Sequence, residues 1–260
     1  MLKPLPANTS YTVHEILIPS MGKKLRFRPF LVKENKALMI AQASNDQLVM
    51  LNTLKSIVAS CCVEQQPLDV DQLATFDFEY LLIRLRSISV DNNVTLNVVC
   101  EDPHDGMPEQ SRTSQVLLNL DNIEVIGLEK YKTKIRLSDD LFVLMKKPTM
   151  EMLEEQEEVT DYESNIHHVM KQIDKICTDD EVYDVSEYTE QQLLDWIDGL
   201  TDTQLQNMLE YFNTIPYCRI KVEWTCPVCG KRNVRYINSF LISIVYYLTN
   251  PIVFSNFSLR

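Results

Sequence analysis

Residues 226–230 read Cys-Pro-Val-Cys-Gly and lie between two runs of alternating apolar and polar residues, 218–224 and 233–236. Alternation with a period of two residues is typical of half-buried β-strands. The stretch therefore predicts a β-hairpin with the Cys-x-x-Cys turn at its tip. Gly230 can adopt the positive φ angle that such a turn needs. Because two thiolates on one tip can bind the same ion, the turn also predicts half of a tetrahedral zinc site.

The other half of the zinc site is predicted in a second, similar hairpin far upstream. A strand-like run at residues 94–99 ends at Cys100, and a further strand-like run follows the turn that contains His104. Thiolate sulfur and imidazole nitrogen are the ligands that structural zinc prefers in proteins. We therefore predict that Cys100 and His104 join Cys226 and Cys229 in a site of three cysteines and one histidine.

Other interpretations of these cysteines stay open. Cys100 can be a small buried apolar residue at the end of a strand, and the Cys-x-x-Cys stretch can be a tight turn without metal. The motif also occurs in dithiol oxidoreductases, where the first cysteine lies at the N-terminus of a helix. Here a strand-like run follows the motif, which argues against redox catalysis. His167 and His168 are adjacent, so they point to different faces of a helix and do not predict a metal pair.

The composition indicates a globular protein of a reducing compartment. The chain has 260 residues, of which 45% are hydrophobic, enough for one large core or two smaller ones. Seven cysteines without a secretory signal fit free thiols better than a disulfide framework, so we expect a cytoplasmic protein. The most apolar run, residues 240–248, is far shorter than the roughly 20 residues needed to span a membrane, and no membrane association is expected.

The charge of the chain is strongly negative and unevenly distributed. A net charge of -12 and a pI near 4.8 argue against a nucleic-acid-binding protein. Residues 151–190 are densely acidic, whereas the N-terminal region carries a basic group made of Lys23, Lys24, Arg26, Arg28, Lys33 and Lys36. These charges are either solvated surface faces or a device that steers assembly partners into a fixed orientation.

The scarcity of glycine predicts long regular segments. With only five glycines in the chain, few tight turns can be built from glycine, so we expect the segments between them to be mainly helical. Helical spacing of apolar residues or helix-start signals predict helices at 33–59, 71–89, 161–177, 189–199 and 202–212. The predicted fold class is α+β, mainly helical, with an N-terminal β-hairpin and two zinc-ribbon-like β-hairpins.

Four segments follow from this pattern. They are an N-terminal β-hairpin arm (1–32), a helical region with the first Cys-containing hairpin (33–148), an acidic helical region (149–216), and the Cys-x-x-Cys hairpin with an apolar C-terminal segment (217–260). We expect the basic N-terminal hairpin to contact protein partners. The aromatic-rich stretch 240–257 either does the same or docks on the core of its own chain.

The sequence lacks the common catalytic motifs. It contains no glycine-rich phosphate loop, no Gly-x-Ser-x-Gly and no His-Glu-x-x-His, and its four histidines give little material for acid–base chemistry. The sequence therefore predicts a protein that is not an enzyme.

Several stretches of the chain are similar to one family of viral proteins. Residues 2–6, 11–34, 75–82 and 85–89 resemble the T-even-type (T4-like) bacteriophage baseplate hub proteins, which comprise hub subunits and hub assembly proteins. The match extends weakly to residues 144–149, and the Cys-Pro-x-Cys-Gly hairpin is similar to this group as well. The resemblance covers most of the first 150 residues.

The resemblance implies a late structural or assembly protein of a contractile-tailed phage. Such a protein helps to build the central hub of the baseplate, with other hub proteins or tape-measure proteins as partners, in the host cytoplasm during assembly. Whether it stays in the virion or leaves as a chaperone is open. The alternative is a zinc-ribbon nucleic-acid-binding regulator, which Lys231, Arg232 and Arg235 beside the Cys-x-x-Cys turn favour.

Overall fold

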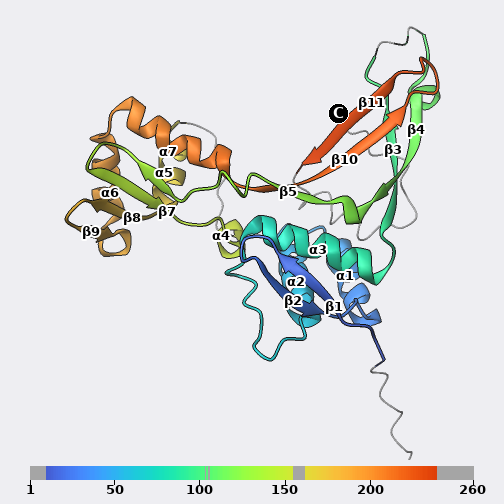
Figure 1. Ribbon diagram of the computed structural model, residues 1–260, viewed down its shortest axis with the longest axis horizontal. Helices are drawn as coiled ribbons and strands as arrows, with labels where there is room; N and C mark the ends of the chain where they lie inside the picture. Colours follow the sequence, from blue (N-terminus) through green and yellow to red (C-terminus); the bar gives the residue numbers. More distant parts are fainter. Residues whose placement is uncertain (1–9, 103, 105, 155–161, 239–260) are drawn as a thin grey trace, which may run out of the picture. The chain divides into compact units, whose positions relative to one another are not determined.

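The computed structural model describes residues 10–102, 104, 106–154 and 162–238 (Figure 1). The chain divides into two compact units. The first is formed by residues 1–70, 76–124 and 218–260, and the second by residues 71–75 and 125–217. Each unit is described by itself below.

The first unit begins with the predicted N-terminal hairpin, which is confirmed. Strands β1 (His14–Ile18) and β2 (Lys23–Phe27) pair antiparallel, with His14 opposite Phe27. Both strands alternate between exposed and buried side chains, so one face of the hairpin enters the core.

Three helices follow the hairpin and lie against it in Figure 1: α1 (Val32–Ser44), α2 (Gln47–Cys61) and α3 (Thr75–Ser89). The sequence predicted one helical stretch over residues 33–59, but the structure has two helices there. Asn45 adopts a left-handed conformation with φ 54°, and the Asp46 side chain caps α2 by accepting from the backbone N–H groups of Leu48 and Val49. Short polar side chains of this kind end one helix and begin the next.

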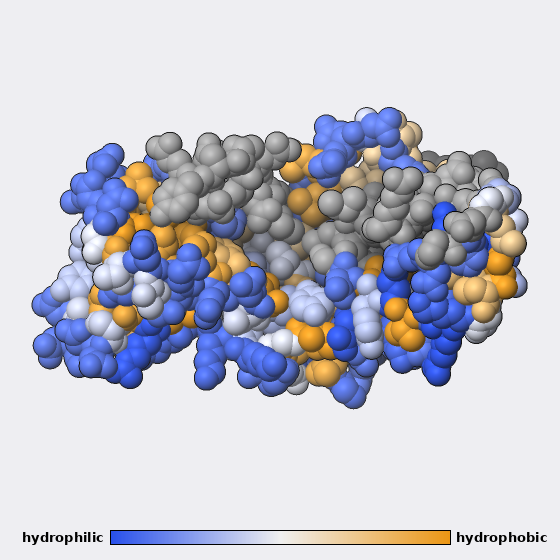
Figure 2. All heavy atoms as spheres, turned by 90° about the horizontal axis from the view of Figure 1, so that it is seen from above, coloured by the Kyte–Doolittle hydropathy of each residue, from blue (hydrophilic) through white to orange (hydrophobic). Residues whose placement is uncertain are grey.

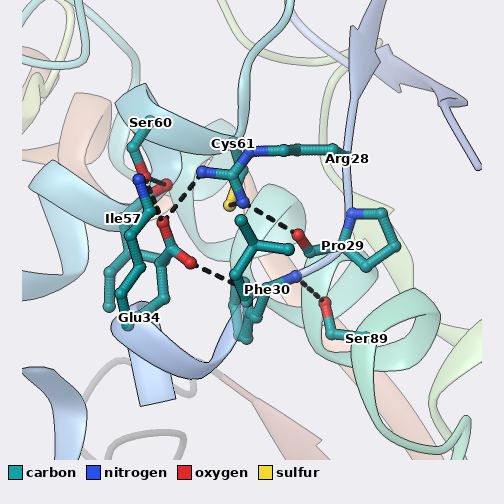
Figure 3. Close-up of polar contacts among 10 residues, drawn as sticks. Arg28, Pro29, Phe30, Glu34, Ile57, Ser60, Cys61 and Ser89 are labelled. Atoms are coloured by element: carbon teal, nitrogen blue, oxygen red, sulfur yellow. Dashed lines mark hydrogen bonds and ion pairs between the residues drawn. The ribbon is translucent and has the colours of Figure 1, made fainter. Parts of the chain in front are cut away.

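A buried ion pair links Arg28, which follows β2, to Glu34 on α1, and α2 adds a hydrogen bond to it (Figure 3). The guanidinium of Arg28 donates to Glu34 Oε1 at 2.8 Å, and the backbone N–H of Leu31 donates to Glu34 Oε2 at 2.8 Å. Ser60 on α2 also donates to Glu34 Oε1, at 3.2 Å. Arg28 and Glu34 are 5% and 4% exposed, so this carboxylate is held by three donors with almost no access to water.

The two Cys-containing hairpins complete the first unit, and both are confirmed. Strands β3 (Asn93–Val99) and β4 (Thr113–Asn119) pair antiparallel, as do β10 (Tyr217–Thr225) and β11 (Arg232–Asn238). The short strand β5 (Glu124–Ile126) lies where the chain passes from the first unit into the second. The short 3-10 helices η1 (Glu109–Arg112) and η2 (Leu120–Asn122) flank β4.

The second unit contains a four-stranded antiparallel sheet of order β6-β7-β8-β9. Its strands are β6 (Lys134–Arg136), β7 (Leu141–Met145), β8 (Ile173–Thr178) and β9 (Val182–Asp184). Its helices are α4 (Met150–Glu154), α5 (Tyr162–Lys171), α6 (Glu190–Asp198) and α7 (Asp202–Thr214), with the 3-10 helix η3 (Val185–Glu187) before α6. The predicted capping box of Thr189 and Gln192 opens α6, which ends at Gly199 as expected.

The core of this unit lies between the sheet and α5, α6 and α7. It is formed by apolar side chains from all of these elements, among them Val143, Ile173, Ile197, Met208 and Tyr211. The Tyr211 hydroxyl lies 2.8 Å from the hydroxyl of Tyr131 and donates to the backbone carbonyl of Lys146 at 2.8 Å. The core therefore satisfies the one polar group of its largest side chain.

The predicted fold class was wrong, because the chain is not mainly helical. The described residues form seven α-helices and eleven strands in four sheets, which is a mixed α/β fold. Residues 173–177 were expected at the end of a helix, but they form most of β8.

The scarcity of glycine misled the prediction because other residues build the turns. Between β6 and β7, Ser138 donates to Asp140 at 2.7 Å, and Arg136 binds Asp139. Between β8 and β9, the hydroxyl of Thr178 accepts from the backbone N–H of Glu181 at 3.1 Å. Aspartate, serine and threonine side chains fold such turns without glycine.

Among the described residues, no helix is both long and apolar enough to cross a lipid bilayer. The apolar stretch 240–257 lies outside the described residues.

Figure 2 shows that hydrophilic residues cover much of one face of the molecule, with apolar residues gathered in separate groups between them.

Candidate metal centre

The four predicted metal ligands come together at the tips of the two hairpins. Cys100 directly follows β3, and His104 lies in the connection from β3 to β4. Cys226 and Cys229 lie in the turn between β10 and β11. The ligand atoms of these four residues all lie within 4.8 Å of one another.

The Cys-x-x-Cys turn is closed by its own backbone. The N–H of Gly230 donates to the carbonyl of Cys226 at 3.0 Å, and the N–H of Cys226 donates to the carbonyl of Lys231 at 2.9 Å. Gly230 has a φ angle of 68°, a conformation that glycine adopts without strain. The backbone N–H of Val228 points to Cys226 Sγ at 3.4 Å, so the turn offers a donor to the sulfur.

The imidazole of His104 is oriented for binding through Nε2. Its Nδ1 atom lies 2.5 Å from the carbonyl oxygen of Asp102, which can only accept a hydrogen bond. Nδ1 therefore carries the proton, and the lone pair of Nε2 faces Cys226 Sγ at 3.4 Å. Metal-binding histidines are commonly held by such a bond from the other ring nitrogen to a carbonyl group.

The environments of the cysteines differ. Burial opposes ionisation of Cys226, but hydrogen bonds from the backbone N–H groups of Cys229 and Val228 lower the pKa of its thiol to about 6. Burial raises the pKa of Cys100, which is fully enclosed. Cys229 is exposed at the surface. The cluster thus has a buried side and one ligand in contact with solvent.

Ion pairs hold the two hairpins together around the cluster. Lys231 Nζ lies 2.7 Å from the Asp102 carboxylate, and Arg235 pairs with Glu101. Ser114 on β4 also donates to the carbonyl of Thr225 on β10 at 3.3 Å. These partners were not predicted, although opposite charges beside the two cysteine-containing turns were a signal for them.

The arrangement can hold a metal ion. All seven cysteines are free thiols, and three of them contribute to the cluster with one imidazole nitrogen. Zinc–sulfur bonds of about 2.3 Å would separate the ligand atoms of a tetrahedral site by about 3.8 Å. The ligand atoms, all within 4.8 Å of one another, lie close to this spacing.

The other polar residues singled out in the sequence lie elsewhere. His167 pairs with Glu190 at 3.1 Å, and the ring of His168 lies 5.2 Å from that of Phe212, so neither belongs to the cluster. Four of the six N-terminal basic residues have carboxylate partners. These pairs are Lys24 with Glu15, Arg26 with Glu64, and Arg28 and Lys33 with Glu34.

Comparison with known proteins assigns the family. A family model described as T4 bacteriophage base plate protein matches residues 10–242. No curated protein and no solved structure matches the chain. The matched range contains both hairpins, all four candidate ligands and most of the chain, and it confirms the resemblance of the N-terminal stretches to baseplate proteins. The chain therefore belongs to the family of T4 bacteriophage base plate proteins.

Proposed function

We propose that this baseplate protein acts in the assembly of the central hub, through contacts with other hub proteins or with tape-measure proteins. Its family makes it a structural protein of a phage baseplate. The similarity of residues 11–34 and 75–89 to hub proteins supports the more specific role. Assembly would take place in the host cytoplasm.

The observation that carries this proposal is a set of exposed apolar side chains on the consecutive helices α1 and α2. Its five members, which we call the α1–α2 patch, are Val32, Met39, Ile40, Leu48 and Val49, and they are between 42% and 73% exposed. The opposite face of α1 is buried through Leu38 and Ala41, so this helix is apolar on both sides. Large apolar side chains that are exposed on neighbouring elements are typical of a protein–protein interface.

Substitution within the α1–α2 patch tests the proposal in infected cells. Met39→Glu with Ile40→Glu places two charges at an interface that must exclude water, so we expect normal heads and few complete tails. The measurement is a count of heads and tails by electron microscopy, compared with an amber mutant of the gene. Because both side chains are at least 66% exposed, the stability of the isolated protein should hardly change.

Val90→Glu is the matched control, because Val90 is 60% exposed but follows α3, outside the patch. Phage with this substitution should assemble normally. Normal infectious particles from the amber mutant would contradict the role in assembly. Normal tails from the Met39 and Ile40 variant alone would contradict only the use of the α1–α2 patch.

The metal that we propose for the cysteine cluster is zinc, in a structural role. Three sulfur atoms and one imidazole nitrogen form a donor set typical of structural zinc sites. The ligands belong to two hairpins that are far apart in the sequence, so a bound ion would cross-link them. The oriented imidazole of His104 supports this assignment.

The alternative function, a nucleic-acid-binding regulator, receives little support from the hairpin. Its basic side chains have carboxylate partners: Lys231 with Asp102, Arg232 with Glu223 and Arg235 with Glu101. Binding to phosphates requires clustered cations without such partners. Retention of the protein on DNA at physiological salt would favour the alternative.

A further inference from the structure

The second unit has a cleft of about 440 Å³, formed by α6 and strands β7, β8 and β9 with the connection that follows them. The apolar side chains of Leu141, Ile176 and Leu193 contribute to its lining. Tyr183, Tyr188 and Trp196 line it as well. None of these residues belongs to the metal centre or to the α1–α2 patch.

The aromatic side chains give this cleft the character of a peptide-binding groove. Tyr188 is 38% exposed, and Tyr183 and Trp196 are half-buried, so their rings remain accessible from the cleft. Grooves lined by tyrosine and tryptophan bind proline-containing segments in the extended polyproline conformation. Such segments are already ordered before binding, so they lose little conformational entropy.

The part of the chain that contributes most of the lining is strongly acidic. From residue 174 to residue 198 the chain has nine carboxylates and one cation, Lys175. Lys175 pairs with Asp184 at 3.9 Å, and Lys146 also faces this carboxylate. Glu187 and Asp195, which adjoin Tyr188 and Trp196 in the sequence, are exposed. The field at the cleft therefore attracts cations and repels anionic segments.

We propose that this cleft binds an extended, proline-containing and positively charged segment of another baseplate protein. Proline and aliphatic side chains of the segment pack on the aromatic and apolar lining. Its lysine or arginine side chains face the carboxylates at the rim or lie over the aromatic rings, where cations are favoured. The inference relies on a different surface from the α1–α2 patch, and its test requires no phage assembly.

Titration of the full chain with a synthetic peptide tests this site. The probe is an end-blocked nonapeptide, Lys-Pro-Leu-Pro-Lys-Pro-Leu-Pro-Lys, and binding is measured by isothermal titration calorimetry. We expect one peptide per chain, with an affinity that falls severalfold as rising salt shortens the screening length. A peptide with glutamate in place of each lysine should not bind, and neither should one with serine in place of each proline.

Variants of the protein locate the binding. Tyr188→Ala should weaken binding at least about fivefold, because exposed aromatic anchors dominate such interfaces. Tyr217→Ala is the matched control, since Tyr217 is 37% exposed but does not line the cleft, and it should bind like the parent. Glu187→Gln with Asp195→Asn should weaken binding at low salt and have little effect at high salt.

Three results would overturn the proposal. They are failure of the lysine peptide to bind, equal binding of the glutamate peptide, and parent-like affinity of Tyr188→Ala. Melting curves recorded for every variant separate a loss of binding from a loss of folding. Binding of the glutamate peptide where the lysine peptide fails would indicate an acidic partner and would contradict the proposed occupant.

Discussion

Glu34 is a single residue on which three elements of the first unit depend. Its carboxylate receives hydrogen bonds from Arg28 at the end of β2, from the backbone of Leu31, and from Ser60 on α2. Burial opposes its ionisation, but the bonds from Arg28 and Leu31 hold the pKa of Glu34 below its ordinary value. The charged form is therefore the one that the folded protein stabilises.

Removing this charge should destabilise the protein strongly at neutral pH. Glu34→Gln leaves the Arg28 guanidinium buried without its counter-charge, which typically costs about 3 kcal/mol of unfolding free energy. Urea unfolding at pH 7 measures the difference. Because the folded-state pKa is depressed, the contribution of Glu34 is complete above its unfolded-state value of about 4.3 and is lost as the pH falls through the folded-state value.

The pH dependence separates this charge effect from a packing effect. The stability difference between the parent and Glu34→Gln should narrow below about pH 4, as the parent carboxylate becomes protonated. Arg28→Leu combined with Glu34→Leu should recover part of the loss, since no unpaired charge stays buried. A difference that is constant between pH 7 and pH 3 would contradict this account of Glu34.

At the scale of the element, the hairpins show which parts of the fold were visible in the sequence. Alternation at residues 94–99 and 218–224 predicted β3 and β10 because one face of each strand is buried. The end of α5 and the start of β8 were missed, since Ile173 and Ile176 fit a helical spacing as well as a strand. Tertiary pairing with β7 decides between the two.

The four candidate ligands could be named from the sequence because few residues were eligible. Outside the Cys-x-x-Cys turn, Cys100 and His104 were the zinc-binding residue types found beside a second strand-like hairpin. The support around them was not predictable from local patterns. Asp102 acts through its backbone carbonyl, which every residue possesses, and the contact between Lys231 and Asp102 joins residues that are 129 positions apart.

Loss of the Cys-x-x-Cys turn should act on folding. We expect about one zinc ion per chain by elemental analysis of the purified protein, and none in Cys226→Ser with Cys229→Ser. If the lost site contributes about 3 kcal/mol, the melting temperature falls by roughly 6–12 °C. Cys62→Ser is the control, because Cys62 lies at the end of α2, outside the cluster, and this variant should keep its zinc.

Two observations together would contradict the zinc assignment. They are a parent protein that contains no metal and a double variant as stable as the parent. The turn would then be held by its backbone hydrogen bonds and by the packing of strands β10 and β11 alone.

At the scale of the whole molecule, the two units should respond separately to perturbation. Each has its own buried residues, and all four candidate ligands belong to the first unit. Calorimetry should therefore show two unfolding transitions. A strong zinc chelator should lower the melting temperature of the first unit only. Tyr211→Phe removes the hydrogen bonds of the hydroxyl group in the core of the second unit. It should lower the unfolding free energy of the second unit only, by about 1–2 kcal/mol.

The outcome that would contradict this independence is also clear. If the chelator and Tyr211→Phe shift the same single transition, the chain unfolds as one cooperative body. The division into units would then describe its contacts but not its thermodynamics.

The order in which the chain is synthesised decides when the four candidate ligands become available to one another. Nearly all of the second unit is one continuous stretch, residues 125–217, between the parts of the first. His104 and Cys226 are 122 positions apart, so the ligands on β3 and its turn emerge long before those on the other hairpin. The second unit can fold before the last two strands of the first unit, β10 and β11, have been synthesised. The four-ligand cluster therefore forms late in the synthesis of this protein. A nascent chain that ends before Cys226 has only two of the four ligands and cannot form it.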